Sequence, residues 1–422
     1  MDSLADLGIG AAGERGSIYG RWLGILKSVQ QKEGGLRKGW SEAARAQFRS
    51  TFNTFLSVYP WFAGYWIHYA RCEFKLGNTQ GVIDVYNRAL VELPYAPDLW
   101  AAYLEFIVLV WHDTDSIDRE FERAVAFVGD DFYSHVVYDV YLEYLTLRNF
   151  HARKSELLLL ILTKTLHQFA KYFAMIRDDG LMGKYYEQQE RVAQAWKYEC
   201  QLHRPTFFHP KPLKQQERAV WIHYLDSQIE NEGFKHQLFR RLLICGALDE
   251  SLWLRYIRWL IAKRQSPIPA FETADRQLSA DLVQVRLYHA LWLEHTGENP
   301  TAIYEKLGSR GAVQASQYAS RTSGDPRSIL ESALESTSSP ADKVDLLREL
   351  VKYDKNAFEA HPLPDNAEYW RAYLAARPDC GEDIYLRAPE GSITNEYLAL
   401  LARTNVVKYV GVDRMVHRSA LV

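Results

Sequence analysis

A tryptophan followed three residues later by a tyrosine recurs along this chain, and the recurrence restricts its fold more than any other feature. The first pair is Trp66 and Tyr69, and Trp100 repeats Trp66 after 34 residues. Residues at i and i+3 lie on one face of an α-helix. The same spacing returns, with tyrosine once in place of tryptophan, at Trp100–Tyr103, Tyr138–Tyr141, Trp221–Tyr224, Trp253–Tyr256 and Trp370–Tyr373. These pairs predict repeated helices that bury an aromatic face.

A second helical pattern follows the early aromatic pairs. VYNRAL contains Arg88, and EFERAV contains Arg123, 35 residues further on. Each repeat therefore holds two helices, and such hairpins must stack because neither can cover its own apolar face alone. No alternating β pattern persists over any length. The sequence predicts an all-α fold, an α-α superhelix in two halves.

The length and one proline-rich segment indicate how the repeats are divided. A chain of 422 residues is too long for one compact core. Three prolines in HRPTFFHPKPL, residues 203–213, exclude a regular helix interior there. The expected divisions are a tail and first helix at 1–40, N-terminal repeats at 41–202, a joint at 203–218 and C-terminal repeats at 219–422.

Charge is distributed unevenly, although the formal net charge is only −3. Residues 66–145 hold 5 Lys/Arg and 14 Asp/Glu, whereas residues 204–264 hold 11 Lys/Arg and 6 Asp/Glu. The basic section is interpreted as a solvated surface, an RNA contact or a surface for an acidic partner. We favour protein binding, because no overall positive charge supports nucleic acid. The candidate cations are Lys211, Lys214, Arg218, Arg240, Arg241, Arg255 and Arg258.

The residues around each candidate catalytic, cofactor or metal motif do not support a functional site there. Gly8 to Gly13 matches G-x-G-x-x-G, but only seven residues precede it, too few for the buried strand that a dinucleotide site needs. His203 and His209 have only Cys200 nearby as a further metal ligand. We expect no catalytic residues, no cofactor and no metal.

Cysteine usage and the N-terminus favour an intracellular protein. The four cysteines are far apart in the sequence, which predicts buried thiols in a reducing compartment. The opening MDSLADLGIG carries acids where a signal peptide needs bases. The longest apolar runs, such as Leu157 to Leu162, are too short to cross a bilayer.

The two-helix unit resembles the HAT repeat, the half-a-TPR unit of RNA-processing scaffolds. Two longer strings, LPYAPDLWAAYLEF and RPTFFHPKPLKQQERAVWIHYLDSQIENEG, resemble the pre-mRNA-processing factor 39 family of the U1 small nuclear ribonucleoprotein. The resemblance extends from about Phe52 to Ile261. After about Ala270 only repeat-like spacing remains.

The resemblance implies a non-enzymatic nuclear scaffold of pre-mRNA splicing, which supports 5′ splice-site recognition by holding proteins of the U1 particle. It implies a homodimer, or a heterodimer with a paralogue, formed through C-terminal repeats within Asp383 to Val422. Pro210 stands where the family more often has a small aliphatic residue. The alternatives are a direct RNA-binding HAT module and a HAT scaffold of another RNA-processing complex, in 3′-end cleavage or ribosome assembly. The family's joint motif falls on Arg204, Pro205, Phe208, His209, Lys211 and Pro212.

Overall fold

The computed structural model contains helices and turns, and no strand occurs in the residues that it describes. It divides into two compact units, Met1–Ser279 and Ala280–Val422. The predicted all-α repeat fold is confirmed. The described residues are 15–176, 178–227, 231–278, 282–322, 324–389, 391–405, 408 and 412.

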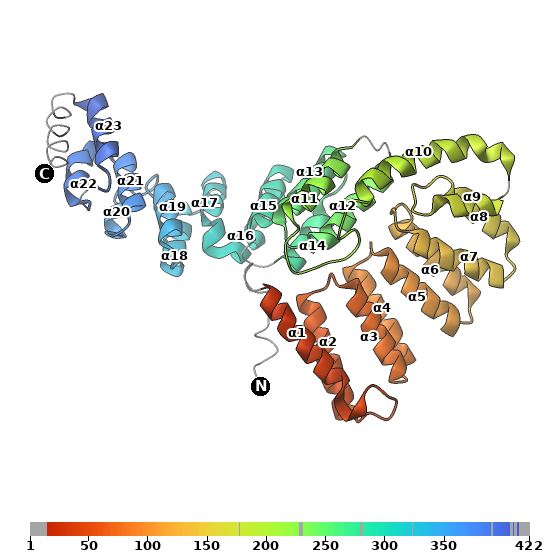
Figure 1. Cartoon of the computed structure of the whole chain (residues 1–422). Helices are drawn as coiled ribbons and strands as arrows, with labels where there is room; N and C mark the ends of the chain where they lie inside the picture. The colour runs from red at the N-terminus through yellow and green to blue at the C-terminus, as the bar shows by residue number, and fades with distance from the viewer. Residues whose placement is uncertain are drawn as a thin grey trace. The chain divides into compact units, whose positions relative to one another are not determined.

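Successive helical hairpins stand side by side in the first unit (Figure 1). Their bounds are α1 Arg15–Gln30, η2 Lys32–Gly34, α2 Glu42–Val58, α3 Ala63–Lys75, α4 Thr79–Glu92, α5 Pro97–Val110, α6 Thr114–Val128, α7 His135–Leu147, α8 His151–Ile161, α9 Phe169–Ile176, η3 Asp179–Leu181, α10 Met182–Glu199, α11 Gln215–Asp226, α12 Glu232–Cys245, α13 Glu250–Ala262 and α14 Ile268–Gln277.

The second unit continues the helical pattern with shorter helices. Here α17 contacts both α18 and α19, and α19 contacts α21. The bounds are α15 Gln284–Thr296, α16 Thr301–Leu307, η4 Gly308–Gly311, α17 Ala312–Arg321, α18 Pro326–Ser336, α19 Pro340–Leu350, α20 Ala357–Ala360, α21 Ala367–Ala376, η5 Pro378–Cys380, α22 Gly381–Arg387 and α23 Thr394–Thr404.

The turn between α3 and α4 shows how the sequence makes a hairpin. Gly77 has φ +81°, a left-handed conformation that ends α3 and that glycine adopts without strain. The Asn78 side chain then caps α4 by accepting a hydrogen bond from the Gly81 amide at 3.1 Å. The same side chain donates to the buried Glu73 carboxylate at 2.7 Å. One asparagine thus joins the end of one helix to the start of the next.

Stacking of the hairpins explains why some helices are apolar on nearly every side. α5 contacts α3, α4, α6 and α7. Its sequence, PDLWAAYLEFIVLV, buries residues on several faces, including Leu99, Trp100 and Ile107 at 0% exposure. A helix enclosed by four neighbours needs apolar residues all round, whereas α6 meets fewer helices and is clearly amphipathic.

The structure differs from the expected division at residues 203–218. That segment lies inside the first compact unit, and residues 219–278 belong to the same unit as the N-terminal repeats. The physical reason is long-range packing. The Trp61 indole donates to the Gln277 side chain at 2.8 Å, so α14 is fixed beside the turn between α2 and α3.

The structure also bears on the expectations for the two ends of the chain and for the four cysteine thiols. Gly8 to Gly13 lies outside the described residues, as does much of the expected dimer region after Asn405. Cys72 and Cys245 are buried, but Cys200 is exposed and Cys380 partly exposed, so the prediction that all four thiols are buried is wrong. In the part of the chain that the structure describes, no helix combines the length and apolar character needed to cross a membrane.

Candidate functional site

The paired aromatic residues form the interior rows of the repeats. None of the twelve is more than 7% exposed. They bridge neighbouring helices: Tyr69 of α3 stacks on Phe52 of α2 with ring centroids 5.0 Å apart, and Tyr141 of α7 stacks on Phe121 of α6 at 4.3 Å. Such pairs contribute about 0.5–1.5 kcal/mol beyond the burial of their area. These residues therefore hold the scaffold together and leave its exposed faces to other side chains.

Four repeat tryptophans share a hydrogen bond that sequence reasoning missed. Each indole Nε1 donates to the carbonyl oxygen six residues earlier, which ties the entering loop to the first turns of the helix. Three of the four acceptors are prolines, so the spacing Pro-x5-Trp is a signal that the sequence contains. The bonds are Trp66 to Pro60 at 2.9 Å, Trp100 to Pro94 at 2.8 Å, Trp253 to Ala247 at 2.9 Å and Trp370 to Pro364 at 2.8 Å.

Trp221 departs from this pattern. Its buried Nε1 has no hydrogen-bond partner in the described part of the chain. An arginine from the following helix covers its ring, as in two N-terminal repeats, so Arg241 and not Arg240 occupies the position of the repeated arginine. The guanidinium-to-ring distances are 5.5 Å for Arg88 over Trp66, 4.9 Å for Arg123 over Trp100 and 5.4 Å for Arg241 over Trp221.

Arg241 lies in a buried ion cluster that joins four segments of the first unit. Its Nη1 donates to the Glu199 carboxylate at 3.2 Å, and its Nε lies 3.5 Å from the Asp131 carboxylate. The Tyr224 hydroxyl donates to Glu199 at 2.9 Å. One cation faces two carboxylates, and burial raises the pKa of Asp131 to about 6. Burial, followed by the Glu199 charge, also raises the pKa of Tyr224.

The predicted basic surface is smaller than expected, because Arg241 belongs to this buried ion cluster. Arg241 is 2% exposed and cannot contact RNA or an acidic partner. Arg218 pairs with Asp249 at 3.0 Å, and Arg255 pairs with Asp226. At least three of the seven candidate cations therefore already face carboxylates of this chain, which reduces the positive charge offered to a partner. Of the others, Arg240 is partly exposed, and the exposed ones are Lys211, Lys214 and Arg258.

The proline strap, residues 203–213, packs onto the N-terminal repeats through Phe208. That ring is 3% exposed, and its centroid lies 4.9 Å from Trp61 and 5.0 Å from Phe62. The preceding Phe207 is 50% exposed. The strap therefore anchors one aromatic ring in the core and presents the other to solvent.

Arg204 holds the strap in a closed turn. Its guanidinium donates to the backbone oxygens of Lys211 and Pro212, both at 2.9 Å. The Lys211 amide donates to His209 Nδ1 at 3.0 Å. Pro205 is half-buried, and Pro212 is exposed. The residues of the predicted joint motif that make these contacts act inside the strap, which gives them a structural role.

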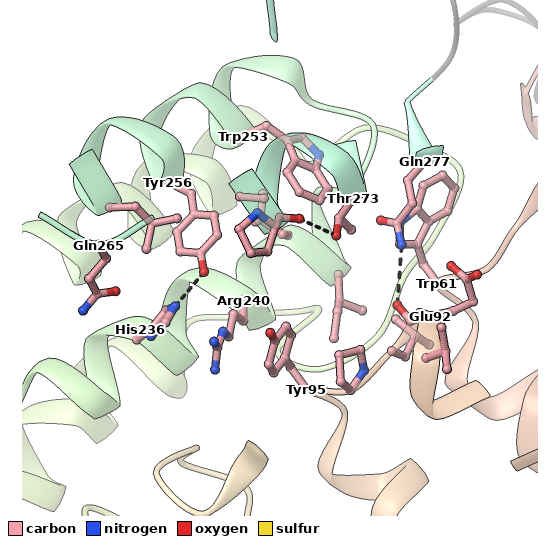
Figure 2. A pocket seen from close by; sticks show the side chains of 18 of the residues that line it. Trp61, Glu92, Tyr95, His236, Arg240, Trp253, Tyr256, Gln265, Thr273 and Gln277 are labelled. Carbon is pink, nitrogen blue, oxygen red and sulfur yellow. Dashed lines mark hydrogen bonds between the residues drawn. The ribbon is translucent and has the colours of Figure 1, made fainter. Parts of the chain in front are cut away.

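The Arg240 pocket lies between the turn from α4 to α5 and the helices α12, α13 and α14 (Figure 2). It has a volume of about 250 Å³. The Arg240 guanidinium lies 3.7 Å from the centroid of the Tyr95 ring. Apolar side chains supply much of the remaining wall, namely Val91, Leu93, Pro94, Leu243, Ile244, Leu260, Pro269 and Ala270.

Polar groups at two ends of this pocket are neutral or already bonded. The His236 ring and the Tyr256 hydroxyl share a hydrogen bond of 2.6 Å (Figure 2). Burial, with a smaller effect of Arg240, lowers the pKa of His236 to about 4, so this ring is uncharged at neutral pH. Figure 2 places Gln277, Trp61 and Glu92 together, away from Arg240. Arg240 is thus the charged group at its end of the pocket.

The repeated hairpins, buried aromatic pairs and arginine-covered tryptophans define an α-solenoid of the HAT class. Residues 14–178 match the family model described as PRP39 N-terminal HAT repeat, and residues 193–318 match PRP39 C-terminal HAT repeat. Together the two matches cover more than half of the chain. The chain belongs to the PRP39 HAT-repeat family.

Similar proteins agree with this assignment. Pre-mRNA-processing factor 39 of Schizosaccharomyces pombe is 27% identical over 353 residues, covering 68% of this chain and 58% of the relative. The human protein of that name is 24% identical, covering 64% of this chain and 49% of the relative. U1 small nuclear ribonucleoprotein component PRP42 of Saccharomyces cerevisiae is 23% identical, covering 59% and 55%. The chain spans about half the length of the curated relatives it matches.

A solved structure shows the same fold at low identity. The crystal structure of CstF-77 superimposes with a TM-score of 0.52 and 11% identity, covering 85% of this chain and 89% of that one. This likeness concerns the helical-repeat architecture alone.

Proposed function

We propose that this chain is a non-enzymatic scaffold of nuclear pre-mRNA splicing that holds proteins of the U1 particle. Membership of the PRP39 HAT-repeat family carries the proposal. Relatives named as a pre-mRNA-processing factor and as a U1 component support it. Among the described residues no group of three His, Cys, Asp or Glu has an arrangement that could hold a metal ion. The proposal assigns the exposed pocket and surfaces to protein binding.

Affinity purification of the tagged chain from nuclear extract tests this function. We expect U1 small nuclear RNA and U1 proteins to be enriched relative to other small nuclear RNAs, measured by reverse-transcription PCR and mass spectrometry. Nuclear extract passed over the affinity tag alone serves as the negative control. Recovery of ribosomal precursors or 3′-end cleavage factors in place of U1 components would favour another RNA-processing complex.

The exposed cations favour one alternative, a direct RNA-binding module. Lys211 and Lys214 are exposed, and a surface that neutralises phosphates loses RNA affinity steeply as salt rises. Pairing of Arg218 and Arg255 with carboxylates weakens this alternative. A salt titration of RNA binding, repeated with Lys211 and Lys214 changed to Glu, distinguishes the two. Affinity insensitive to both salt and substitution excludes the RNA module.

Dimer formation through the C-terminal repeats completes the proposal. The expected surface lies within Asp383 to Val422, where α23 forms the last long described helix. Light scattering of the full chain should give twice the mass of one chain, and a version ending at Ala376 should be monomeric. A monomeric full chain would contradict the dimer without affecting the assignment to splicing.

A further inference from the structure

We propose that the Arg240 pocket binds an acidic side chain of an extended peptide segment from a protein partner, with a neighbouring apolar side chain against the pocket wall. This inference rests on the proposed scaffold function and names the chemistry of one partner. Residues that are distant in the sequence line this pocket together: Tyr95 precedes α5, and Arg240 lies in α12.

The charge of Arg240 provides the first argument. No carboxylate of the described residues pairs with its guanidinium, in contrast to Arg241, Arg218 and Arg255. Its Nε is buried and has no hydrogen-bond partner in the described ranges. A buried donor left without an acceptor costs about 1–3 kcal/mol, and an incoming carboxylate supplies the acceptor as a charge-assisted bond.

The groups around Arg240 also favour an anion. Tyr95 lies under the guanidinium, and His236 and Tyr256 are bonded to each other. Burial lowers the pKa of His236 to about 4 and raises the pKa of Tyr256, so neither group cancels the charge of Arg240. The acid of this pocket, Glu92, lies apart from Arg240 beside Trp61 and Gln277 (Figure 2). A single positive end of a mostly apolar pocket complements an acidic residue next to an apolar one.

The size of the pocket selects an extended segment over a helix. Its volume of about 250 Å³ lies just below the ~300–1,000 Å³ of pockets that enclose drug-sized ligands. That space accommodates one or two side chains, whereas an amphipathic helix needs a groove that receives anchors over several turns.

Single-stranded RNA fits the same pocket less well. RNA-binding grooves combine several cations along the backbone with aromatic platforms. Here Arg240 is the one arginine or lysine among the described residues that line the pocket, while Arg276 lies 3.9 Å from Glu92 and Arg255 pairs with Asp226. Aromatic rings such as Trp61, Tyr95 and Trp253 do line the pocket, but it supplies a single cation where a groove that follows an RNA backbone needs several. One positive charge corresponds to one carboxylate.

A peptide array tests the inference on the full-length chain. The array displays capped tetrapeptides in which a central Asp or Glu is flanked by every amino acid, and a matched array carries Asn or Gln instead. We expect a subset of acidic peptides with an apolar neighbour to bind at least about tenfold more tightly than their amide counterparts, since one charge-assisted bond contributes that much. Eight-nucleotide polyuridine is the RNA probe.

Three variants locate the binding site. Arg240→Gln should lower the affinity for the selected peptides about tenfold, and Thr273→Phe should block the pocket while Arg240 stays in place. Arg255→Gln, which removes an exposed cation of α13, is the control and should bind as the unmodified chain does. Circular dichroism confirms that each variant is folded.

Equal binding of acidic and amide peptides overturns the inference, as does retention of acidic-peptide binding in Thr273→Phe. Polyuridine binding that depends on Arg240, without acidic-peptide binding, overturns it in favour of a nucleotide site. Recovery of U1 components together with equal peptide binding leaves the scaffold function intact. Selective acidic-peptide binding without U1 recovery retains the pocket and removes the splicing assignment.

Discussion

Arg241 of α12 and Glu199 of α10 form an ion pair in the interior of the first unit, 42 positions apart in the chain. Their side chains are 2% and 0% exposed. Asp131, from the turn between α6 and α7, faces the same guanidinium. Through Asp131 the cluster joins the turn between α6 and α7 to α10 and α12, which lie much further along the chain.

Removal of the buried cation should destabilise the first unit strongly. Arg241→Met leaves Glu199 and Asp131 buried without a counter-charge, which costs about 3–5 kcal/mol. Arg255→Met breaks an exposed pair and should change the free energy of unfolding by less than about 1 kcal/mol. Urea denaturation of both variants measures the difference. Equal midpoints for the two variants would show that the buried cluster contributes little.

Asp131 should make stability depend on pH in an unusual direction. Burial raises its pKa to about 6, above the ~3.9 of the unfolded chain. The folded state therefore binds this proton more tightly, and the associated stability is complete below pH ~4 and lost as pH rises through about 6. Relative to Asp131→Asn, the unmodified chain should gain on the order of 2 kcal/mol between pH 7 and pH 4.5. A constant difference between the two proteins across this range would contradict the raised pKa.

The indole hydrogen bond should distinguish two tryptophans that are equally buried. Trp100→Phe leaves the Pro94 carbonyl without its donor, whereas Trp221→Phe removes an Nε1 that has no partner in the described structure. We expect Trp100→Phe to cost about 1 kcal/mol more, the net contribution of one partly buried hydrogen bond. Both rings are 0% exposed, so cavity effects are similar. Thermal unfolding followed by near-ultraviolet circular dichroism compares the variants.

Two adjacent phenylalanines of the proline strap provide a further matched pair. Phe208→Ala should cost about 3–5 kcal/mol because the ring is buried against Trp61 and Phe62. Phe207→Ala should cost less than about 1 kcal/mol, since half of that side chain is exposed. Limited proteolysis should cut the strap faster in the Phe208 variant alone. Similar cleavage rates would mean that Phe208 does not anchor the strap.

The fold was predictable from the sequence because its signals are local. The Trp66–Tyr69 spacing reports one helical face, and Gly77 reports a helix end, without knowledge of any distant residue. The Pro-x5-Trp spacing is equally local and was available.

The surroundings of the candidate site were not predictable in the same way. Arg240 and Arg241 are adjacent and chemically identical, yet one lines an accessible pocket and the other is enclosed by carboxylates. The difference arises from Glu199 and Asp131, whose positions depend on the packing of whole helices. Net charge over a segment counts both arginines alike, so it overestimated the basic surface.

The hydrogen bond between Trp61 and Gln277 spans 216 positions of the chain. In an open array of repeats each unit touches only its neighbours, so the ends can unravel one repeat at a time. Here the last helix of the first unit is fastened to its early helices, and opening either end exposes both. The first unit should consequently unfold as one cooperative block. Its folding should be slow, because its long-range contacts join residues that are distant in the sequence.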